Sequence, residues 1–228
     1  MKFIPQNAKV RILQGKLSGK KWIKGSGVNG YWLGTYELEG QKVFIENLKS
    51  GDIIFDIGAN VGFYSLLAAE LAGEESRVFS FEPLEENFNY LKKHILINNY
   101  RNIFLFKEAV ADKNDFGFFK KEKSSAMGHL GDGNIKVETI SLDEWIKNGK
   151  LPFPNFLKID VEGAEFSVLK GAQNLLKEKH PIIFLSIHGD LLREKCFNFL
   201  LSSGYDLFPI KKEGLNKANE ILAKFKLK

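Results

Sequence analysis

The stretch GDIIFDIGANVG, residues 51–62, decides the fold of this 228-residue chain. Its apolar run, residues 53–55, is typical of a buried parallel strand. Residues 63–72 place apolar side chains at helical spacing. The turn between these two segments combines an acid with residues that tolerate unusual backbone angles, namely Asp56, Gly58, Asn60 and Gly62. Strand, glycine-rich turn and helix together predict the opening of a nucleotide-binding βαβ unit.

The spacing of these residues discriminates between ligands. A dinucleotide-binding loop has the pattern G-x-G-x-x-G, whereas this loop has D-x-G-x-N-x-G. An acid at the end of a strand suits a cationic, amine-bearing ligand better than a pyrophosphate. S-adenosylmethionine (SAM) carries a sulfonium, an amine and one carboxylate, so the loop favours SAM. The alternative, an ordinary turn without a ligand, is disfavoured because two glycines, an Asn and an Asp coincide.

Length and composition are those of a globular α/β protein. With 228 residues, of which 44% are hydrophobic, the chain suits one α/β domain with a small appendage. No apolar run is long enough to span a membrane, and residues 1–5 lack the apolar region of a signal peptide. Because Cys196 is the only cysteine, we expect no disulfide framework and a location in the reducing cytosol.

The net charge of +5 is compatible with anionic substrates or nucleic acid. Much of the excess consists of lysines near the two ends of the sequence. No stripe of arginine and aromatic residues accompanies them, so a solvated lysine surface is favoured over a nucleic-acid groove. Nucleic acid is therefore a disfavoured partner.

Residues 1–50 do not follow the βαβ pattern. Short strand-like runs separated by glycines predict a β-rich N-terminal module at 10–13, 21–23, 36–38 and 43–45. The SAM-binding domain is then expected at 51–228. Four residues of this module have two interpretations: Tyr31, Trp32, Tyr36 and Glu37. They could reach the ligand side of the domain, but the favoured interpretation is that the aromatic residues form the core of the module.

A second acid follows the next predicted strand. Residues 77–81 form an apolar run that ends in Glu82, 20 residues after Gly62. This spacing places a carboxylate where it accepts both ribose hydroxyls of a nucleoside. An unrelated surface glutamate is the alternative, but it explains neither the spacing nor the position at a strand end.

A third strand is predicted at 103–106, and the turn after it is expected to flank the adenine ring. Ala109 and Val110 provide an apolar wall for the ring. Asp112 has two interpretations, as a hydrogen-bond partner of the exocyclic amine or as a turn-forming residue. Residues 116–120 and 135–140 predict an inserted β-hairpin, with residues 124–129 between them as a mobile cover over the substrate.

Charged residues gather after the fourth and fifth predicted strands, at 155–159 and 182–187. They are Asp160, Glu162, Glu165 and His188. The carboxyl ends of parallel strands meet at the edge of the sheet where ligands bind. A sixth strand is predicted at 205–210, and residues 219–226 favour a strand that pairs antiparallel beside it over a helix.

Five stretches together resemble the FkbM-type family of SAM-dependent methyltransferases: LGTYE at 33–37, DIGANVGFYSL at 56–66, FEP at 81–83, TISLDEW at 139–145 and KIDVEGAE at 158–165. The resemblance covers about residues 10–210. It implies a Rossmann-like class I fold, a seven-stranded, mostly parallel sheet flanked by helices. The implied strand order is 3-2-1-4-5-7-6, with the last strand antiparallel.

The resemblance also implies SAM as cofactor and O-methylation of a hydroxyl on a sugar or another small metabolite. It assigns Asp56, Gly58, Asn60 and Gly62 to the loop around the methionine part, Glu82 to the ribose, and Asp160 to the neighbourhood of the transferable methyl group. The chain departs from the family pattern at Ser186, where members often carry an acid, and this puts the roles around His188 in question.

Methylation of an alcohol is assisted by a base that removes the hydroxyl proton. The candidates are His188, Asp160, Glu162, Glu165 and His129. His188 ranks first because imidazole titrates near neutrality, with a loop hydrogen bond as the alternative. Asp160 is expected to orient the cofactor amine or the substrate. Glu165 has a second interpretation, as a first-turn carboxylate that the helix dipole stabilises.

No metal site is predicted because histidines and cysteines do not cluster, with Mg²⁺ at Asp160 and its neighbouring carboxylates as the disfavoured alternative. Two other classes of function are weighed. An NAD-dependent oxidoreductase would share the spacing from Gly62 to Glu82, but the glycine fingerprint is missing. A nucleic-acid methyltransferase or RNA-binding module would use the positive charge, but the sequence has no Asn-Pro-Pro-aromatic motif and no Pro before Cys196.

Overall fold

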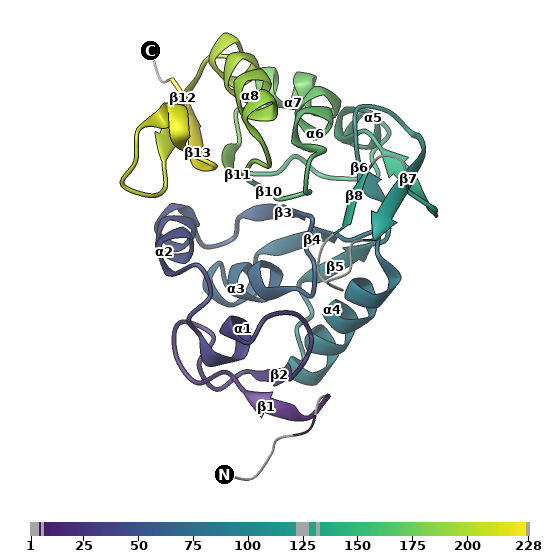
Figure 1. Cartoon of the computed structure of the whole chain (residues 1–228), viewed down its shortest axis with the longest axis vertical. Helices are drawn as coiled ribbons and strands as arrows, with labels where there is room; N and C mark the ends of the chain where they lie inside the picture. The colour runs from purple at the N-terminus through teal and green to yellow at the C-terminus, as the bar shows by residue number, and fades with distance from the viewer. Residues whose placement is uncertain (1–4, 6, 122–127, 131–132, 227–228) are drawn as a thin grey trace.

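The computed structural model describes residues 5, 7–121, 128–130 and 133–226. A seven-stranded sheet with the order β12-β13-β11-β10-β3-β4-β5 forms its centre (Figure 1). Its strands are β3 (Ile53–Ile57), β4 (Arg77–Phe81), β5 (Ile103–Phe106), β10 (Phe156–Ile159), β11 (Ile182–Ser186), β12 (Tyr205–Pro209) and β13 (Glu220–Phe225). β13 pairs antiparallel with β11 and β12, and all other neighbouring strands of this sheet pair parallel. The predicted order and the antiparallel last strand are confirmed.

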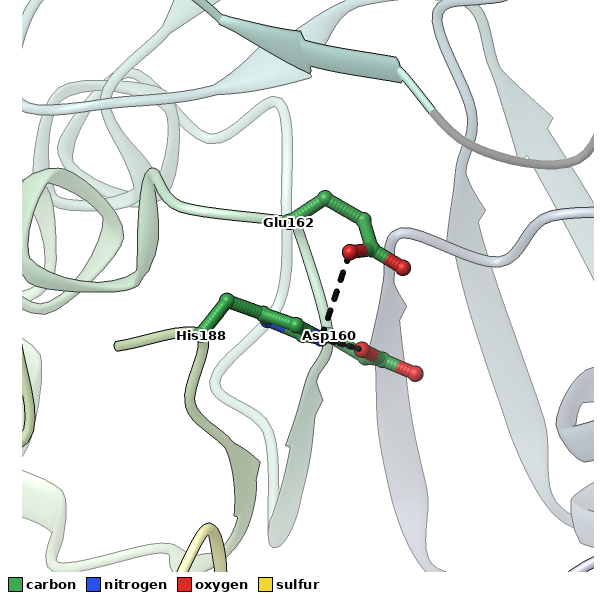
Figure 2. A group of neighbouring side chains, drawn as sticks. All are labelled: Asp160, Glu162 and His188. Atoms are coloured by element: carbon green, nitrogen blue, oxygen red, sulfur yellow. Dashed lines mark ion pairs between the residues drawn. The ribbon is translucent and has the colours of Figure 1, made fainter. Parts of the chain in front are cut away.

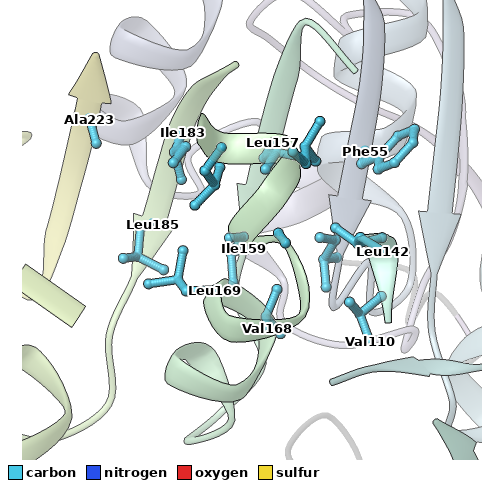
Figure 3. Close-up of a cluster of buried hydrophobic side chains, with 14 of the residues drawn as sticks. Phe55, Val110, Leu142, Leu157, Ile159, Val168, Leu169, Ile183, Leu185 and Ala223 are labelled. Carbon is cyan, nitrogen blue, oxygen red and sulfur yellow. The ribbon is translucent and has the colours of Figure 1, made fainter. Parts of the chain in front are cut away.

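Helices cover both faces of this sheet because successive strand residues point to opposite sides (Figure 1). Ile54 packs into the cluster beneath α2 (Leu38–Asn47), α3 (Phe63–Leu71) and α4 (Glu85–Asn98). Phe55 packs into the other cluster, under α5 (Leu142–Lys147), α6 (Glu165–Gly171), α7 (Gln173–Lys179) and α8 (Asp190–Ser202). Figure 3 shows the second cluster, in which Phe55, Leu157 and Ile183 from three neighbouring strands meet Val168 and Leu169 of α6.

The N-terminal segment contains fewer strands than predicted. β1 (Lys9–Arg11) and β2 (Lys21–Ile23) form an antiparallel pair, followed by the short helix α1 (Gly30–Leu33). The strands expected at 36–38 and 43–45 are wrong, because α2 occupies most of this region. Its residue Phe44 packs edge-on against Tyr64 of α3 and against Phe156 and Phe184 of two distant strands, and these contacts override local strand propensity. The domain boundary at residue 50 stays a prediction.

A second sheet, with the order β6-β9-β7-β8, lies beside the first. It contains β6 (Ala109–Val110), β7 (Asp115–Lys121), β8 (Gly128–Leu130) and β9 (Ile135–Ile140). β7 and β9 pair antiparallel, which confirms the predicted hairpin. Most of the expected cover, residues 124–127, lies outside the described residues, as do the side-chain surroundings of His129. None of the helices in the described part of the chain combines the length and apolar character that a membrane span requires.

A buried histidine joins the N-terminal segment to the turn after β3. His94 of α4 is fully buried and stacks on Trp22 with ring centroids 3.8 Å apart. The Ile23 amide donates to Nε2 at 3.1 Å, and Nδ1 lies 2.8 Å from the carbonyl oxygen of Val61. The ring is therefore neutral, with its proton on Nδ1. Burial lowers the pKa of His94 to about 4.

We expect this histidine to make the fold acid-sensitive. Between pH 6.5 and about 4 the unfolded chain binds a proton at His94 that the folded chain does not. The free energy of unfolding should therefore fall by about 3 kcal/mol more in the wild type than in His94→Gln when the pH drops from 7 to 4. Urea denaturation at each pH measures this difference. His180→Gln is the control, because this exposed ring also stacks on an aromatic, Phe225, and its loss should keep the wild-type pH dependence. Equal pH slopes in the wild type and His94→Gln would contradict the prediction.

Candidate active site

A cavity of about 350 Å³ lies at the carboxyl ends of β3, β4 and β10. Its walls come from the turns after these strands, from the second sheet, from α3 and from the N-terminal segment. The cavity has the size of a small-molecule site, for which roughly 300–1,000 Å³ is usual. Most of its lining is apolar and aromatic, with a few polar side chains such as Glu82, Lys158 and Asp160.

The turn between β3 and α3 approaches the turn after β10 so closely that only glycine fits at position 58. Gly58 has φ +78°, and a Cβ atom there would lie 1.9 Å from the backbone oxygen of Asp160. Asn60 also adopts left-handed angles, with φ 51°, and its side-chain oxygen accepts a hydrogen bond from the Val61 amide at 2.7 Å. Gly58 and Asn60 both line the cavity.

The other two residues assigned to this loop, Asp56 and Gly62, are not among the residues that line the cavity. Gly62 precedes α3 with φ +96°, and a Cβ atom there would lie 2.3 Å from Cδ1 of Leu91 on α4. Its lack of a side chain therefore lets α3 and α4 pack together. Asp56 is inside β3 rather than at its end, and it accepts a hydrogen bond from Ser65 of α3 at 2.6 Å.

A buried lysine without an assigned role in the sequence analysis is the ionic partner of Asp56. Lys158 of β10 is the register neighbour of Asp56, and its Nζ lies 3.3 Å from Asp56 and 3.5 Å from Asp160. Burial alone would lower the pKa of Lys158, but Asp56 and Asp160 raise it above its ordinary value. The sequence carried a signal for this pair, because Lys158 is a lone cation inside an apolar strand. A buried charge requires a partner, so an acid on a neighbouring strand could have been expected.

Glu82 follows β4 and is nearly fully buried. One of its oxygens accepts the amide of Asn60 at 2.8 Å and the other accepts the amide of Leu84 at 2.9 Å. Burial raises the pKa of Glu82 to about 7, although these hydrogen bonds and one from Asn87 act in the opposite direction. Each carboxylate oxygen keeps acceptor capacity toward the cavity, which Glu82 lines.

The turn after β5 provides an apolar wall of the cavity. Ala109 and Val110 form β6, are buried, and line the cavity together with Phe119 of β7. Asp112 is engaged elsewhere. Its carboxylate lies 2.7 Å from Nζ of Lys170, and this cation lowers the pKa of Asp112. Of its two interpretations, the structure favours a role in the turn over a contact with adenine.

Asp160, Glu162 and His188 meet at the ends of β10 and β11 (Figure 2). Nε2 of His188 lies 3.3 Å from Glu162 and 3.9 Å from Asp160. Nδ1 lies 2.7 Å from Oε1 of Glu165, a fully buried residue. The charged residues that follow the fourth and fifth predicted strands are thus brought together. Asp160 and Glu162 line the cavity, whereas His188 and Glu165 lie outside its lining.

The hydrogen bond to Glu165 raises the pKa of His188 to about 9, and the charges of Glu162 and Asp160 act in the same direction. At neutral pH the ring is therefore an imidazolium cation that already carries the proton a base would accept. One donor atom each from Asp160, Glu162 and His188 lie within 4.8 Å of one another, a spacing that also suits a metal ion. A metal would have to displace the His188 proton. His188 as the base stays a prediction.

Residues 56–219 match the family model described as "Methyltransferase FkbM domain". Hexuronic acid methyltransferase AglP of Haloferax volcanii is 30% identical over 149 residues, which are 64% of this chain and 60% of that protein. Methyltransferase FkbM from Methylobacillus flagellatus KT has a TM-score of 0.57 at 16% identity, over 87% of this chain and 56% of that chain. A SAM-dependent O-methyltransferase from Thermotoga maritima has a TM-score of 0.55 at 12% identity, over 98% of this chain and 79% of that chain. This chain thus spans about three fifths of the length of AglP and of the Methylobacillus protein. The two solved structures have the same fold as this chain.

Proposed function

The chain belongs to the FkbM methyltransferase family, and we propose that it transfers a methyl group from SAM to an oxygen atom of a sugar or another small hydroxylated metabolite. The observation that carries the proposal is the position of Glu82, whose buried carboxylate lines the same cavity as the Gly58 turn and the apolar wall at Val110. A sugar-like acceptor is supported by the name of the relative AglP, a hexuronic acid methyltransferase.

The residues of the cavity fit this cofactor. Glu82 would accept the two ribose hydroxyls, since each of its oxygens accepts one backbone amide and still has lone pairs to spare. Ala109, Val110 and Phe119 would enclose the adenine ring. Asp160 would face the amine and the cationic sulfur, because it is the partly exposed carboxylate beside Gly58. SAM, when bound, would supply an electrophilic methyl group on a positively charged sulfur.

The chain's contribution to catalysis is alignment, charge and removal of a proton. Holding the acceptor oxygen, the methyl group and the sulfur in line is worth roughly 7–11 kcal/mol of the barrier. A base adds about 10²- to 10⁴-fold in rate when the acceptor is an alcohol. His188 would serve as that base only at alkaline pH, because its pKa is raised to about 9. Membership in a methyltransferase family disfavours the NAD-dependent oxidoreductase.

The assignment of Glu82 is tested by calorimetric titration with SAM and with S-adenosylhomocysteine. In Glu82→Gln we expect both affinities to fall about 10- to 100-fold, the loss of one or two hydrogen bonds to a charged group. Glu85→Gln is the control, because Glu85 is exposed, pairs with Lys107 and lies outside the cavity lining. Affinities for Glu82→Gln within threefold of the wild type would contradict the assignment.

The acceptor class is tested with SAM labelled in its methyl group and a panel of neutral hexosides, hexuronosides, lipids and random RNA. Label on a sugar supports the proposal, and label on RNA would favour the nucleic-acid methyltransferase instead. Mild alkali distinguishes two products, because it releases the label from a methyl ester and leaves a methyl ether intact.

A further inference from the structure

One wall of the cavity comes from residues outside the segment that matches the family model. Val28, Tyr31 and Tyr36 line the cavity, whereas the match covers residues 56–219. The rings of Tyr31 and Tyr36 have centroids 4.5 Å apart, and that of Tyr36 lies 6.4 Å from Tyr64 on α3. The Nζ atom of Lys158 lies 5.1 Å from the centre of the Tyr64 ring. This wall is therefore aromatic and lies on the Lys158 side of the cavity.

Glu37 connects two of these tyrosines. The Tyr64 hydroxyl donates to Oε2 of Glu37 at 2.9 Å, and the Tyr36 side chain lies close enough to Glu37 to favour its charged form. Glu37 has left-handed backbone angles, φ 41° and ψ 53°, immediately before α2. A non-glycine residue in this region is strained, and its surroundings must hold it there. Gly40 contributes, since a Cβ atom at this position would lie 3.1 Å from the Tyr64 hydroxyl.

The charges around Glu37 have both signs. Asp160 and Glu220 act on it as negative charges, while the cations Lys158 and Lys211 lie close enough to interact with it. Burial is the largest influence and raises the pKa of Glu37 above its ordinary value. The nearby cations stabilise the charged carboxylate of Glu37, while burial favours its protonated form. His188, in contrast, is already protonated at neutral pH.

We propose that the tyrosine wall is the acceptor subsite for a sugar ring, and that Glu37 receives the proton of the reacting hydroxyl through Tyr36 or Tyr64. This proposal rests on the methyl transfer proposed above. The apolar C–H face of the sugar packs on the tyrosine rings, and one sugar hydroxyl contacts a tyrosine hydroxyl. The sugar O–H proton passes to the tyrosine oxygen while the tyrosine proton passes to the Glu37 carboxylate. The freed oxygen lone pair forms the new O–C bond, and the electrons of the C–S bond leave with sulfur.

The experiment uses the full chain and two probe acceptors, p-nitrophenyl β-D-glucoside and p-nitrophenyl β-D-glucuronide. Saturation-transfer NMR detects sugar binding in the presence of S-adenosylhomocysteine, and labelled SAM gives kcat and KM across pH. We expect Glu37→Gln to lower kcat at least about 100-fold with KM changed less than threefold. We also expect it to lose the acidic limb of the kcat profile and to keep the affinity for SAM. Glu37→Asp should restore part of the rate.

A second pair of residues provides matched controls. Tyr100 donates to Glu70 at 2.9 Å, the same distance as from Tyr64 to Glu37, but this pair is exposed and outside the cavity. Glu70→Gln and Tyr100→Phe should keep the wild-type kcat. Tyr36→Phe and Tyr64→Phe leave Glu37 in place. One of the two should lower kcat at least about 100-fold, as expected for Glu37→Gln. These variants test the proton transfer even if the Glu37 variants do not fold.

The outcomes separate this proposal from the one on which it rests. Binding of S-adenosylhomocysteine without binding of either sugar overturns the acceptor subsite and leaves the cofactor site intact. An alkali-labile methyl ester as the product overturns the proton transfer, because a carboxylate has no proton to lose. Unchanged kcat in Glu37→Gln, or in both tyrosine variants, overturns it as well. Failure to bind S-adenosylhomocysteine counts against methyl transfer itself.

Discussion

Gly58→Ala is expected to lower the free energy of unfolding by about 3 kcal/mol, the sum of left-handed backbone strain and a steric collision. The added Cβ atom would lie 1.9 Å from the backbone oxygen of Asp160, and that oxygen belongs to the turn after β10. A backbone atom cannot rotate away as the end of a side chain does, so the two turns must separate. Because Gly58 and Asp160 both line the cavity, the separation should also weaken the binding of SAM.

Gly51→Ala isolates the collision from the backbone strain. Gly51 has φ +80°, close to the +78° of Gly58, but a Cβ atom there meets nothing within 4 Å. The control should therefore lose only the cost of left-handed backbone, about 1 kcal/mol, and should bind SAM like the wild type. Urea denaturation gives the stabilities and calorimetry gives the affinities. Stabilities of the two variants within about 0.5 kcal/mol would show that the turns move apart freely, against this argument.

The strands of the main sheet were predictable because each is a short apolar run, a signal that does not depend on distant residues. β4 lies at 77–81 as predicted, and the strand expected at 155–159 differs from β10 by one residue. The strand order came from the resemblance to a family rather than from the runs themselves. α2 was missed because its residues 43–45 have strand propensity on their own. The helix is favoured by Phe44, whose partners Phe156 and Phe184 are more than a hundred residues away.

The positions of the acidic site residues along the strands were predictable from the sequence, but the directions in which their side chains point were not. Acids at the ends of parallel strands identified Glu82 and Asp160, which line the cavity. Asp56 was assigned to the loop around the methionine part, yet it lies one residue before the end of β3 and faces α3. Since side chains alternate along a strand, that single position decides which face Asp56 occupies. The same alternation places Lys158 beside it and explains why its partner is a carboxylate on the neighbouring strand.

Lys158→Met is expected to lower the free energy of unfolding by about 3–5 kcal/mol, the usual effect of removing one partner of a buried ion pair. Asp56 is the residue left behind, with 1% of its side chain exposed. Asp160 also loses its cation, but with 24% exposed it can be hydrated. Because Asp160 is part of the cavity wall, we expect SAM affinity to fall along with stability. Denaturant titration and calorimetry measure the two effects.

Two further variants show whether the unpaired charge is the cause. Asp56→Asn with Lys158→Met removes both charges and keeps an oxygen for Ser65, so it should be more stable than Lys158→Met alone. Lys170→Met breaks an ion pair with Asp112 that is 2.7 Å long but partly exposed, and it should lose less than about 1 kcal/mol. If the double variant is no more stable than Lys158→Met, the loss reflects the space left by the lysine side chain rather than the charge of Asp56. A loss in Lys170→Met as large as that in Lys158→Met would show that burial does not set the strength of these pairs.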